Sequence, residues 1–449
     1  MAVNVVLPTI IVEAAFTKGQ PVAGAGAITL NDATFGLLDT DFLNSADVWT
    51  DITAFVRGFT ITRSSTRLQG PLLQFEPGTA TVILNNSDGR FDPLNQSGPY
   101  WLNGQSQVRG MVPIRISATW NNVYYPLFRG FADSWQEPSV EFAGAVTDWT
   151  LTATDCFKVL DGITLPPVTA VGASEFTGAR IHRILDAAGW YSGAGPGARS
   201  IAAGDSQLQA TTFDDTAMNL MQLAADSEIG QLYVDGSGAV VFRNRNALIT
   251  ETRSVVPQAV FGDNPGNAYD IVYGNVYLYE LACATISRSC DDTTIGNDIQ
   301  ATRVGGTLQE VKDAASIARF LFPRTYTRSD LILLSDLDAH NWAGWVLYVS
   351  LDCEDRVSEF TVNPQDDPNN LWPQVLGRQM MDRVTVNRRP PNAGLISNDG
   401  FISGIVHNYD VASSQWTTTF GCQDAERYGS FFTLDGAIAG QLDHNAIAY

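Results

Sequence analysis

The chain has 449 residues, of which 45% are hydrophobic and 17% charged, with 39 Gly and 20 Pro. This composition predicts roughly two to four globular domains, with three as the working number, built mainly from short strands and turns, and it argues against disorder and long helices. The formal net charge of −21 argues against a reader of nucleic-acid sequence, which needs a basic face to neutralise phosphates.

The N-terminal stretch MAVNVVLPTIIVEAAF is apolar but has no basic segment and no convincing cleavage site, so we expect an opening strand or arm and no signal peptide. No apolar run reaches the roughly 20 residues of a membrane-spanning helix. An odd number of Cys with no C-x-x-C pair predicts free, mostly buried thiols and folding in a reducing cytoplasm. These residues are Cys156, Cys283, Cys290, Cys353 and Cys422.

Short alternating runs dominate from about residue 49 to residue 153. Apolar and polar residues alternate over residues 58–62, 113–120 and 148–154, as expected for strands with one buried face. Turns rich in Gly and Pro separate these runs. The spacing predicts a β-sandwich or a barrel.

Within this region, TATVILNNSDGRFDPLNQSGPYW begins as a strand and breaks into a polar loop. The spacing of its oxygen donors does not fit a calcium loop, because Leu84 occupies the first ligand position. A structural loop explains more residues: Gly89 supplies a positive φ, Arg90 pairs with a nearby carboxylate, and Phe91 acts as a plug. The oxygen donors are Asn85, Asn86, Ser87, Asp88 and Asp92.

After Cys156 the apolar spacing becomes helical. FTGARIHRILDAAGW predicts an amphipathic helix with Thr177 as its N-cap and Gly189 as its stop, and TTFDDTAMNLMQLAADSEIG predicts a second helix. QLYVDGSGAVVFRNR predicts a hairpin of residues 232–234 and 240–242, with glycines in its turn. We therefore expect a small α/β unit.

Beyond about residue 255 strands return, interrupted by two helices. VKDAASIARFLF has apolar residues at helical spacing from Val311 to Phe322, and SDLDAHNWAGWVLYVS predicts a helix capped by Ser335. Residues 401–411 and 415–423 alternate on either side of a short turn and predict a hairpin. LDGAIAGQLDHNAIAY predicts a turn and a tail.

The sequence predicts no catalytic, cofactor-binding or metal-binding residue, no cofactor, and no enzyme. It has no G-x-S-x-G, Walker A or G-x-G-x-x-G motif in the required context. The four histidines lie far apart, form no ligand pair, and are interpreted as structural: His182, His340, His407 and His444. Among 48 acidic residues, close carboxylates are expected by chance. The pairs considered for a hydrolase are Asp88 with Asp92, Glu137 with Glu141, and Asp352 with Glu354 and Asp355.

Several segments resemble a known family in an ordered series. WTDITAFVRGFTITR, the strand of residues 74–82, LNNSDGRFDPLN, SGPYW, VPIRI, LFRGFADSW and LTATDCFKVL resemble the N-terminal region of minor tail proteins of long-tailed actinobacteriophages. AADSEIGQLYVDGSGAVVFRNR resembles the helix-hairpin unit of baseplate or tail hub proteins. HNYDVASSQWTTTFGCQDAERY resembles the C-terminal end of that family.

The resemblance implies a mainly β fold with α/β insertions, made of two barrel-like domains related to tail-tube subunits, with smaller domains attached. The division expected on this basis is an N-terminal arm (1–25), a first barrel-like hub domain (26–157), a helix-hairpin domain (158–254), a second barrel-like domain with helical additions (255–432) and a C-terminal tail (433–449).

The resemblance also implies a structural virion protein, a hub that links the tail tube to the tip. Three copies would form a ring of pseudo-sixfold symmetry around an acidic channel, through which DNA passes without specific binding. Expected partners are distal tail or tube proteins, the tape measure protein, other tail-tip proteins and, at infection, the host envelope. Assembly would take place in the host bacterial cytoplasm and the final location would be the virion tail tip.

Three alternatives remain open. A distal tail ring protein would normally have six copies. A receptor- or carbohydrate-binding tail-tip module would need an exposed aromatic platform, for which Trp190 and Tyr191 are candidates. A cell-wall hydrolase would clear a peptidoglycan gel. The acidic net charge is also explained by solubility alone.

Overall fold

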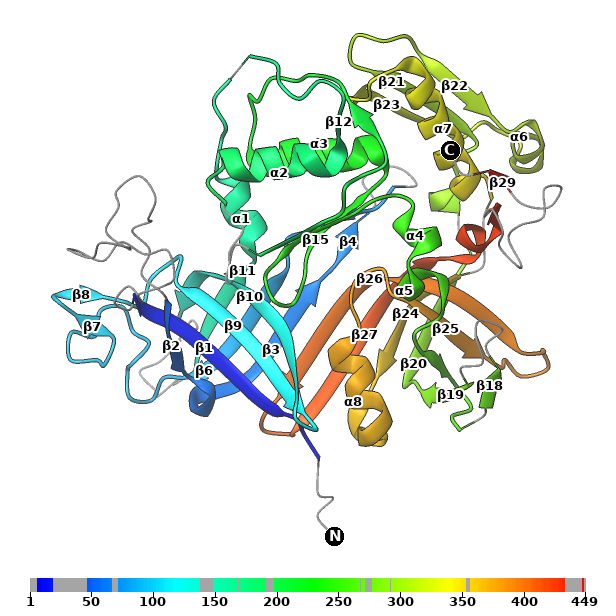
Figure 1. The fold of residues 1–449 in the computed structure, drawn as a ribbon. Coiled ribbons are helices and arrows are strands. Elements are labelled where there is room, and N and C mark those ends of the chain that lie inside the picture. The colour runs from blue at the N-terminus through cyan, green and yellow to red at the C-terminus, as the bar shows by residue number, and fades with distance from the viewer. Residues whose placement is uncertain are drawn as a thin grey trace.

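The computed structural model of the protein describes residues 6–18, 47–66, 72–137, 148–167, 169–190, 198–266, 268–270, 277–290, 292–352, 356–432 and 446–447. Two β-rich units lie side by side, and a lobe of helices and small sheets lies above them (Figure 1). The predicted fold class, mainly β with smaller α/β parts attached, is confirmed.

The first sheet unit is antiparallel and has the strand order β1-β9-β10-β11-β6-β3, with β2 paired to the outer side of β1. Its strands alternate buried and exposed residues, as the sequence pattern predicted. Their bounds are β1 (Thr9–Lys18), β2 (Asp47–Asp51), β3 (Val56–Arg63), β6 (Thr79–Asn85), β9 (Pro113–Trp120), β10 (Val123–Gln136) and β11 (Asp148–Thr154).

The second sheet unit has the order β17-β25-β26-β27-β24-β20, with β19 and β18 beyond β17. The pair β17 with β25 is parallel, whereas the pairs from β25 to β20 are antiparallel. The bounds are β17 (Val260–Gly262), β18 (Ala268–Asp270), β19 (Tyr277–Ala282), β20 (Thr285–Ser289), β24 (Arg356–Val362), β25 (Arg383–Arg388), β26 (Ile396–Asp410) and β27 (Gln415–Asp424).

The two units repeat each other in detail. In the first, Met111 N donates to Ala132 O at 2.8 Å, and in the second, Met381 N donates to Ile402 O at 2.7 Å. Both methionines have a φ of 64°. The strands β10 and β26 each carry a bulge directly after this contact, at Ala132 and at Ile402. Equal strand order, and an equal bulge and register where β10 and β26 pair with β11 and β27, show that the five strands β9-β10-β11-β6-β3 and β25-β26-β27-β24-β20 are structural equivalents. The pair β24 with β20 differs by a register shift between Ser287 and Arg288.

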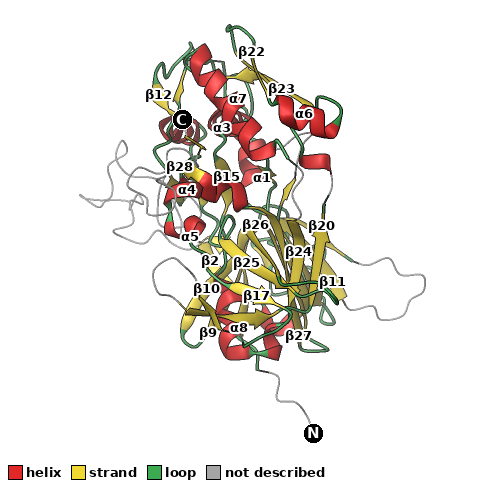
Figure 2. Cartoon of the chain, turned by 90° about the vertical axis from the view of Figure 1, so that its right-hand side faces the viewer, coloured by secondary structure: helices red, strands yellow, loops and turns green. Residues whose placement is uncertain are grey.

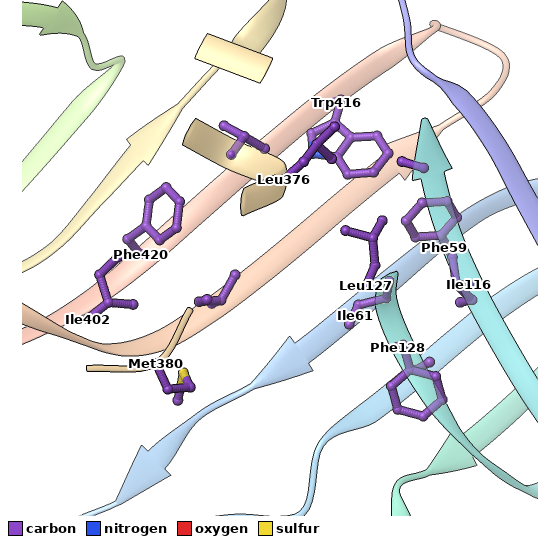
Figure 3. Packing of buried hydrophobic residues seen from close by; sticks show 14 of the residues in the cluster. Phe59, Ile61, Ile116, Leu127, Phe128, Leu376, Met380, Ile402, Trp416 and Phe420 are labelled. Atoms are coloured by element: carbon purple, nitrogen blue, oxygen red, sulfur yellow. The ribbon is translucent and has the colours of Figure 1, made fainter. Parts of the chain in front are cut away.

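Strand β26 joins the units into one sheet. Its N-terminal half pairs with β25, and its last residues, 405–410, pair with β3 of the first unit. The apolar faces of both units contribute to one core (Figure 3). Helix α8 (Pro368–Gly377) covers this core, and Trp372 packs against Trp416 with ring centroids 5.4 Å apart. Phe59 of β3 contacts the same Trp416 ring at 5.3 Å.

The upper lobe is formed by two segments distant in sequence, residues 156–250 and 292–352, which share a second core. Trp342 Nε1 donates to Asp226 O at 2.9 Å, and Arg328 pairs with Asp226 at 2.8 Å. Figure 2 shows the lobe from the side, with its helices gathered above the strands. The helices are α1 (Cys156–Asp161), α2 (Thr177–Ala187), α3 (Ala217–Glu228), α4 (Ala247–Thr250), α6 (Ala314–Phe320) and α7 (Asp336–Ser350), with α5 (Thr252–Val255) directly beneath.

Three small sheets complete this lobe. They are β12 (Glu175–Phe176) with β14 (Gln207–Leu208), β13 (Arg199–Ile201) with β16 (Val240–Arg243) and β15 (Gln231–Val234), and β22 (Gln309–Lys312) with β21 (Asp298–Arg303) and β23 (Thr325–Leu331). The remaining short strands are β4 (Ser65–Thr66), β5 (Gln74–Phe75), β7 (Trp101–Leu102), β8 (Gln105–Ser106), β28 (Phe431–Phe432) and β29 (Ala446–Ile447).

Two local predictions are wrong. Residues 311–322 do not form one helix, because Val311 pairs with Ile299 in a strand and α6 begins only after Asp313, whose carboxylate caps the N–H of Ser316. Leu321, which the predicted helix would place on its apolar face, is 78% exposed. Thr177 is not the N-cap of α2. It is the first helical residue, and its hydroxyl donates to Ser206 O.

The other strand and helix predictions are confirmed. Strands β9 and β11 have the predicted bounds, both predicted hairpins form, and Gly189 follows the end of α2 with a φ of 71°. Ser335 caps α7 through a capping box with Asp338. The division into ranges 1–25, 26–157, 158–254, 255–432 and 433–449 stays a prediction. Most of the expected C-terminal tail lies outside the described residues.

Candidate functional site

The candidate site is one face of the joined sheet, opposite the apolar core, which we call the hydroxyl face. It arises because Thr and Ser occupy many of the alternate positions of β3, β6, β11, β10, β27 and β24, whose other positions are mostly buried and apolar. Its residues are Thr60, Thr62, Thr79, Thr81, Ser134, Thr150, Thr152, Thr154, Thr361, Asn408, Thr417 and Thr419.

Cross-strand pairs make the hydroxyl face continuous across both units. Thr60 lies between Thr81 of β6 and Asn408 of β26, and its hydroxyl donates to Asn408 Oδ1 at 2.8 Å. Farther along the sheet, the hydroxyls of Thr361 and Thr419 lie 2.9 Å apart. Such contacts hold neighbouring side chains in place on a polar surface.

The centre of this face is hollowed. A depression of about 310 Å³ lies where β3, β6, β26 and β27 meet, and residues of both units line it. Ile83 on its wall is 42% exposed, although it is a large apolar residue. The described chain therefore leaves this junction open.

Charged groups stand at intervals on the hydroxyl face. Asp148 is 3.9 Å from Arg57, and Asp133 pairs with Lys158 and accepts from the Thr154 hydroxyl. The other charged residues on this face are Glu359 and Asp410. Among the described residues, four carboxylates and two cations give this face a small net negative charge, and most of it is uncharged.

The polar loop predicted as architecture is built as expected. The Asp88 carboxylate pairs with Arg90, whose guanidinium lies 3.7 Å from the centre of the Phe55 ring. Phe91 is fully buried between aromatic rings, and Asn86 Oδ1 accepts from its N–H at 2.8 Å. The Arg90 hydrogen bond lowers the pKa of Asp88.

The remaining expected turn contacts are also present. Asn85 and Asp92 accept from the N–H groups of Ser87 and Leu94, and Gly89 has a φ of 71°. Within the described residues, no group of three or more His, Cys, Asp or Glu residues is placed to hold a metal ion.

A buried polar cluster lies between the two sheet units and the upper lobe. Asp155 caps α1 by accepting from Phe157 N at 2.9 Å, and it also accepts from Gly78 N at 2.5 Å. Burial raises the pKa of Asp155 to about 7, against the effect of these two donors. Arg63 lies beside it and donates to Gln379 Oε1 of the second unit at 3.0 Å, and burial lowers its pKa.

The histidines of the described chain are not brought together. His407 is buried in β26 with Nδ1 2.9 Å from Thr418 Oγ1, and burial lowers its pKa to about 3. His182 lies on α2 with Nδ1 3.5 Å from an Arg199 nitrogen, and His340 is exposed on α7. His444 lies outside the described residues.

The described carboxylates of the pairs considered for a hydrolase include three with structural partners. Asp88 bonds to Arg90 and Asp92 to a backbone N–H, so each has a structural partner. Asp352 pairs with Arg319 at 2.6 Å. The partners Glu141, Glu354 and Asp355 lie outside the described residues, as does Tyr191 of the proposed aromatic platform, whereas Trp190 is half-buried.

The hydroxyl face was not recognised from the sequence, although the signal is present in it. Thr recurs at alternate positions, twice in TATVILN, three times in DWTLTAT and twice in QWTTTFG. Alternation was read as evidence for strands, but it does not show which strands become neighbours. No helix in the described part of the chain is long and apolar enough to cross a membrane.

Two solved structures share this fold. A tail protein from Neisseria meningitidis MC58 aligns with 84% of this chain and 94% of its own, with a TM-score of 0.52 and 12% identity. The 43 kDa tail protein of prophage MuSo2 from Shewanella oneidensis aligns with 94% of this chain and 98% of its own, with a TM-score of 0.51 and 11% identity. At such identity the likeness shows the fold alone.

The sequence itself matches no protein-family model and no curated protein. The chain therefore has the fold of these two solved tail proteins while sharing about one residue in eight or nine with them.

Proposed function

We propose that this chain is a structural subunit of a phage tail or tail-like particle, located at the tail tip, where it forms the hub between tube and tip. The fold shared with two tail proteins over most of their length supports a tail role. The observation that carries the hub is the duplicated sheet. Two equivalent units in one chain let three copies supply six units, so a trimer can face a sixfold tube.

The hydroxyl face is the surface that we propose lines the channel of this hub. DNA binds proteins mainly through cations that neutralise its phosphates, and this face carries four carboxylates against two cations. Thr and Ser hydroxyls are hydrated but uncharged, so they form no ion pair with a phosphate. The sequence led us to expect an acidic channel. We instead propose a channel wall that is mostly uncharged and has a small net negative charge.

The proposed partners follow from this position. Distal tail or tube proteins would contact one rim of the ring, and the tape measure protein and other tail-tip proteins would contact the rest. We propose no catalytic step for the chain, because the buried Asp155 and His407 have structural partners at the inter-unit junction.

A symmetry-resolved map of the tail tip, together with native mass spectrometry of the isolated hub, tests this function. The expected result is three copies in a ring with Thr60 and Thr81 facing the axis. Six copies would instead support a distal tail ring protein. A single copy, or absence from the tail tip, would refute the proposal.

A further inference from the structure

A groove of about 600 Å³ opens on the second sheet unit, between helix α8 and the strands β17 and β19. In Figure 1, α8 lies at the lower edge of the molecule with β19 beside it. Tyr279 and Leu281 of β19 line one wall, and Asn370 and Gln374 of α8 line the other. The volume is in the range of ligand-binding sites, about 300–1,000 Å³. The groove is therefore large enough to receive side chains of a partner.

The first sheet unit shows what fills the matching place there. Strand β2 lies beyond β1 and leads directly into β3, as β19 lies beyond β17 and leads directly into β20. In the first unit, Phe55 of the link from β2 to β3 meets Phe91 of the connection from β6 to β9, with ring centroids 5.8 Å apart. In the second unit the corresponding connection, from β24 to β25, contains α8, and the groove separates α8 from β19. A place that aromatic rings fill in one unit is thus open in the other.

The two walls of the groove offer an aromatic ring and an unused hydrogen-bond acceptor. Tyr279 is 62% exposed, and Leu281, two residues later in β19, faces the same side of the sheet. On the helix wall, Gln374 Oε1 is buried and has no hydrogen-bond partner within the described chain. Buried acceptors are nearly always paired in complete structures. These groups suit a protein segment, because one of its side chains can stack on the ring and one of its N–H groups can donate to Gln374.

The helix end of the groove is acidic. Asp366 and Asp367 line it, and neither forms an ion pair with a cation of the described chain. Asp367 precedes α8 but makes no capping hydrogen bond with its side chain, which instead accepts from Asn370 Nδ2 at 2.9 Å. A third carboxylate on the lining, that of Glu280, is already paired with Arg389 at 2.7 Å. Two carboxylates are therefore available to a cation from outside the described chain.

We propose that this groove binds a segment of another tail protein in which an aromatic residue stands next to a Lys or Arg. The aromatic ring would pack on Tyr279 and Leu281, and the cation would reach Asp366 and Asp367. The inference rests on the tail role proposed above, which supplies the partner. The groove lies on the side of the sheet that α8 covers, opposite the hydroxyl face, so a bound segment would leave the proposed channel clear.

Photocrosslinking in tail particles that carry the full-length chain tests this groove. The test variant has p-benzoylphenylalanine in place of Asn370, which lines the groove, and the matched control has it in place of Asn369, which is exposed on α8 but does not line the groove. After irradiation, the test variant should be joined to a different protein of the particle. Mass spectrometry of the joined peptide should show an aromatic residue next to Lys or Arg. The control should give several-fold less product.

A charge variant tests the acidic end of the groove. Asp366→Asn with Asp367→Asn, added to the variant with the crosslinker at position 370, should lower the yield several-fold at low salt, because the attraction for the partner's cation is lost. The matched change Asp148→Asn with Asp410→Asn removes two carboxylates from the hydroxyl face and should leave the yield unchanged.

Several results would overturn the inference and leave the proposed function standing. In a tail-tip ring of three copies, these are no bond to another protein, a bond to a second copy of this chain, and a bond to a segment without the aromatic and basic pair. Equal yields from the two crosslinker positions, or a yield that the change at Asp366 and Asp367 does not affect, would also overturn it. Absence of the chain from the tail tip would refute the proposed function and this inference with it.

Discussion

At the scale of single residues, Phe91 fixes the polar loop to the first sheet unit. Its ring is fully buried and lies 5.8 to 5.9 Å from the rings of Phe55, Tyr100 and Trp135. Leu94 lies three residues later in the same loop, and its large apolar side chain is 83% exposed. The loop thus offers a buried and an exposed apolar residue for direct comparison.

Phe91→Ala should lower the free energy of unfolding by about 3–5 kcal/mol, because it removes a buried aromatic ring and leaves a cavity. Urea unfolding followed by tryptophan fluorescence measures this change. The matched variant Leu94→Ala should stay within about 0.5 kcal/mol of the wild type. Equal effects of the two variants would mean that Phe91 does not anchor the loop.

His407 predicts a pH dependence of stability. Burial lowers its pKa to about 3, below the unfolded value of about 6.5, so between these values the unfolded chain binds one more proton than the folded chain. Its contribution is therefore present above about pH 6.5 and is lost as the pH falls toward 3. From pH 6.5 to pH 5 the loss is about 2 kcal/mol, at about 1.4 kcal/mol per pH unit.

His407→Phe removes this titration. The variant should lose about 2 kcal/mol less stability than the wild type between pH 6.5 and pH 5, as measured by urea unfolding at both pH values. Parallel pH profiles for the two proteins would show that the buried imidazole is charged in the folded state.

At the scale of elements, the hairpin of β15 and β16 holds the upper lobe to the first sheet unit. Gly236 in its turn packs so closely that a Cβ atom would lie 2.2 Å from Pro126 O of β10. Gly344 in α7 offers the opposite case, because a Cβ atom there would meet no atom within 4 Å. The effect of a Gly→Ala substitution can therefore be compared at one crowded position and one open position.

Gly236→Ala should force the hairpin away from β10, lowering the melting temperature and speeding proteolysis of the upper lobe, at a cost of about 1–3 kcal/mol. Gly344→Ala should stabilise the chain by about 0.5–1 kcal/mol, since Ala favours a helix interior. Differential scanning calorimetry and limited trypsin digestion compare the two. A Gly236→Ala protein as stable as the wild type would show that the contact between the hairpin turn and β10 does not hold the upper lobe in place.

Sequence patterns predicted elements better than their assembly. Strand β9 and strand β11 were predicted at their observed bounds because one face is buried along the whole strand, which makes the alternation strict. The prediction of one helix from Val311 onward is wrong, because the apolar residues at helical spacing belong to a strand end, a short helix and the exposed Leu321. Local spacing carries no information on the cap at Asp313 that separates them.

The hydroxyl face and the duplicated sheet were beyond local patterns. The equivalent contacts at Met111 and Met381 are made by backbone groups, so the residues that follow them can differ without changing the register. Pro113 and Arg383 begin equivalent strands, for example. The resemblance to tail hub proteins predicts the right fold class, whereas the hydroxyl face depends on β3 and β26 being neighbours, which no local pattern indicates.

At the scale of the whole molecule, the hydroxyl face predicts how DNA passage responds to charge. Thr60 and Thr81 lie opposite each other at the centre of this face. In the proposed channel, Arg at either position would place a cation in each copy beside the DNA, and each phosphate contact makes binding steeply dependent on salt. The fold should tolerate the change, because Thr60 is exposed.

Thr60→Arg with Thr81→Arg should slow DNA release from particles several-fold at low salt, with recovery at higher salt. Release is followed by the fluorescence of a DNA dye after triggering. Thr250→Arg on α4, which is exposed away from the sheet, is the matched control and should release DNA at the wild-type rate. Unchanged, salt-independent release by the double variant would mean that this face is not the channel wall.

Strand β26 gives the molecule a mechanical property. One unbroken backbone of 15 residues pairs with β25 and β27 of its own unit and with β3 of the other. A pull applied to either unit therefore passes to the other along covalent bonds, and separating them requires several parallel hydrogen bonds to slide in shear at once. Such a joint would suit the proposed tail-tip role, in which the molecule must stay intact while a tail under tension meets a cell.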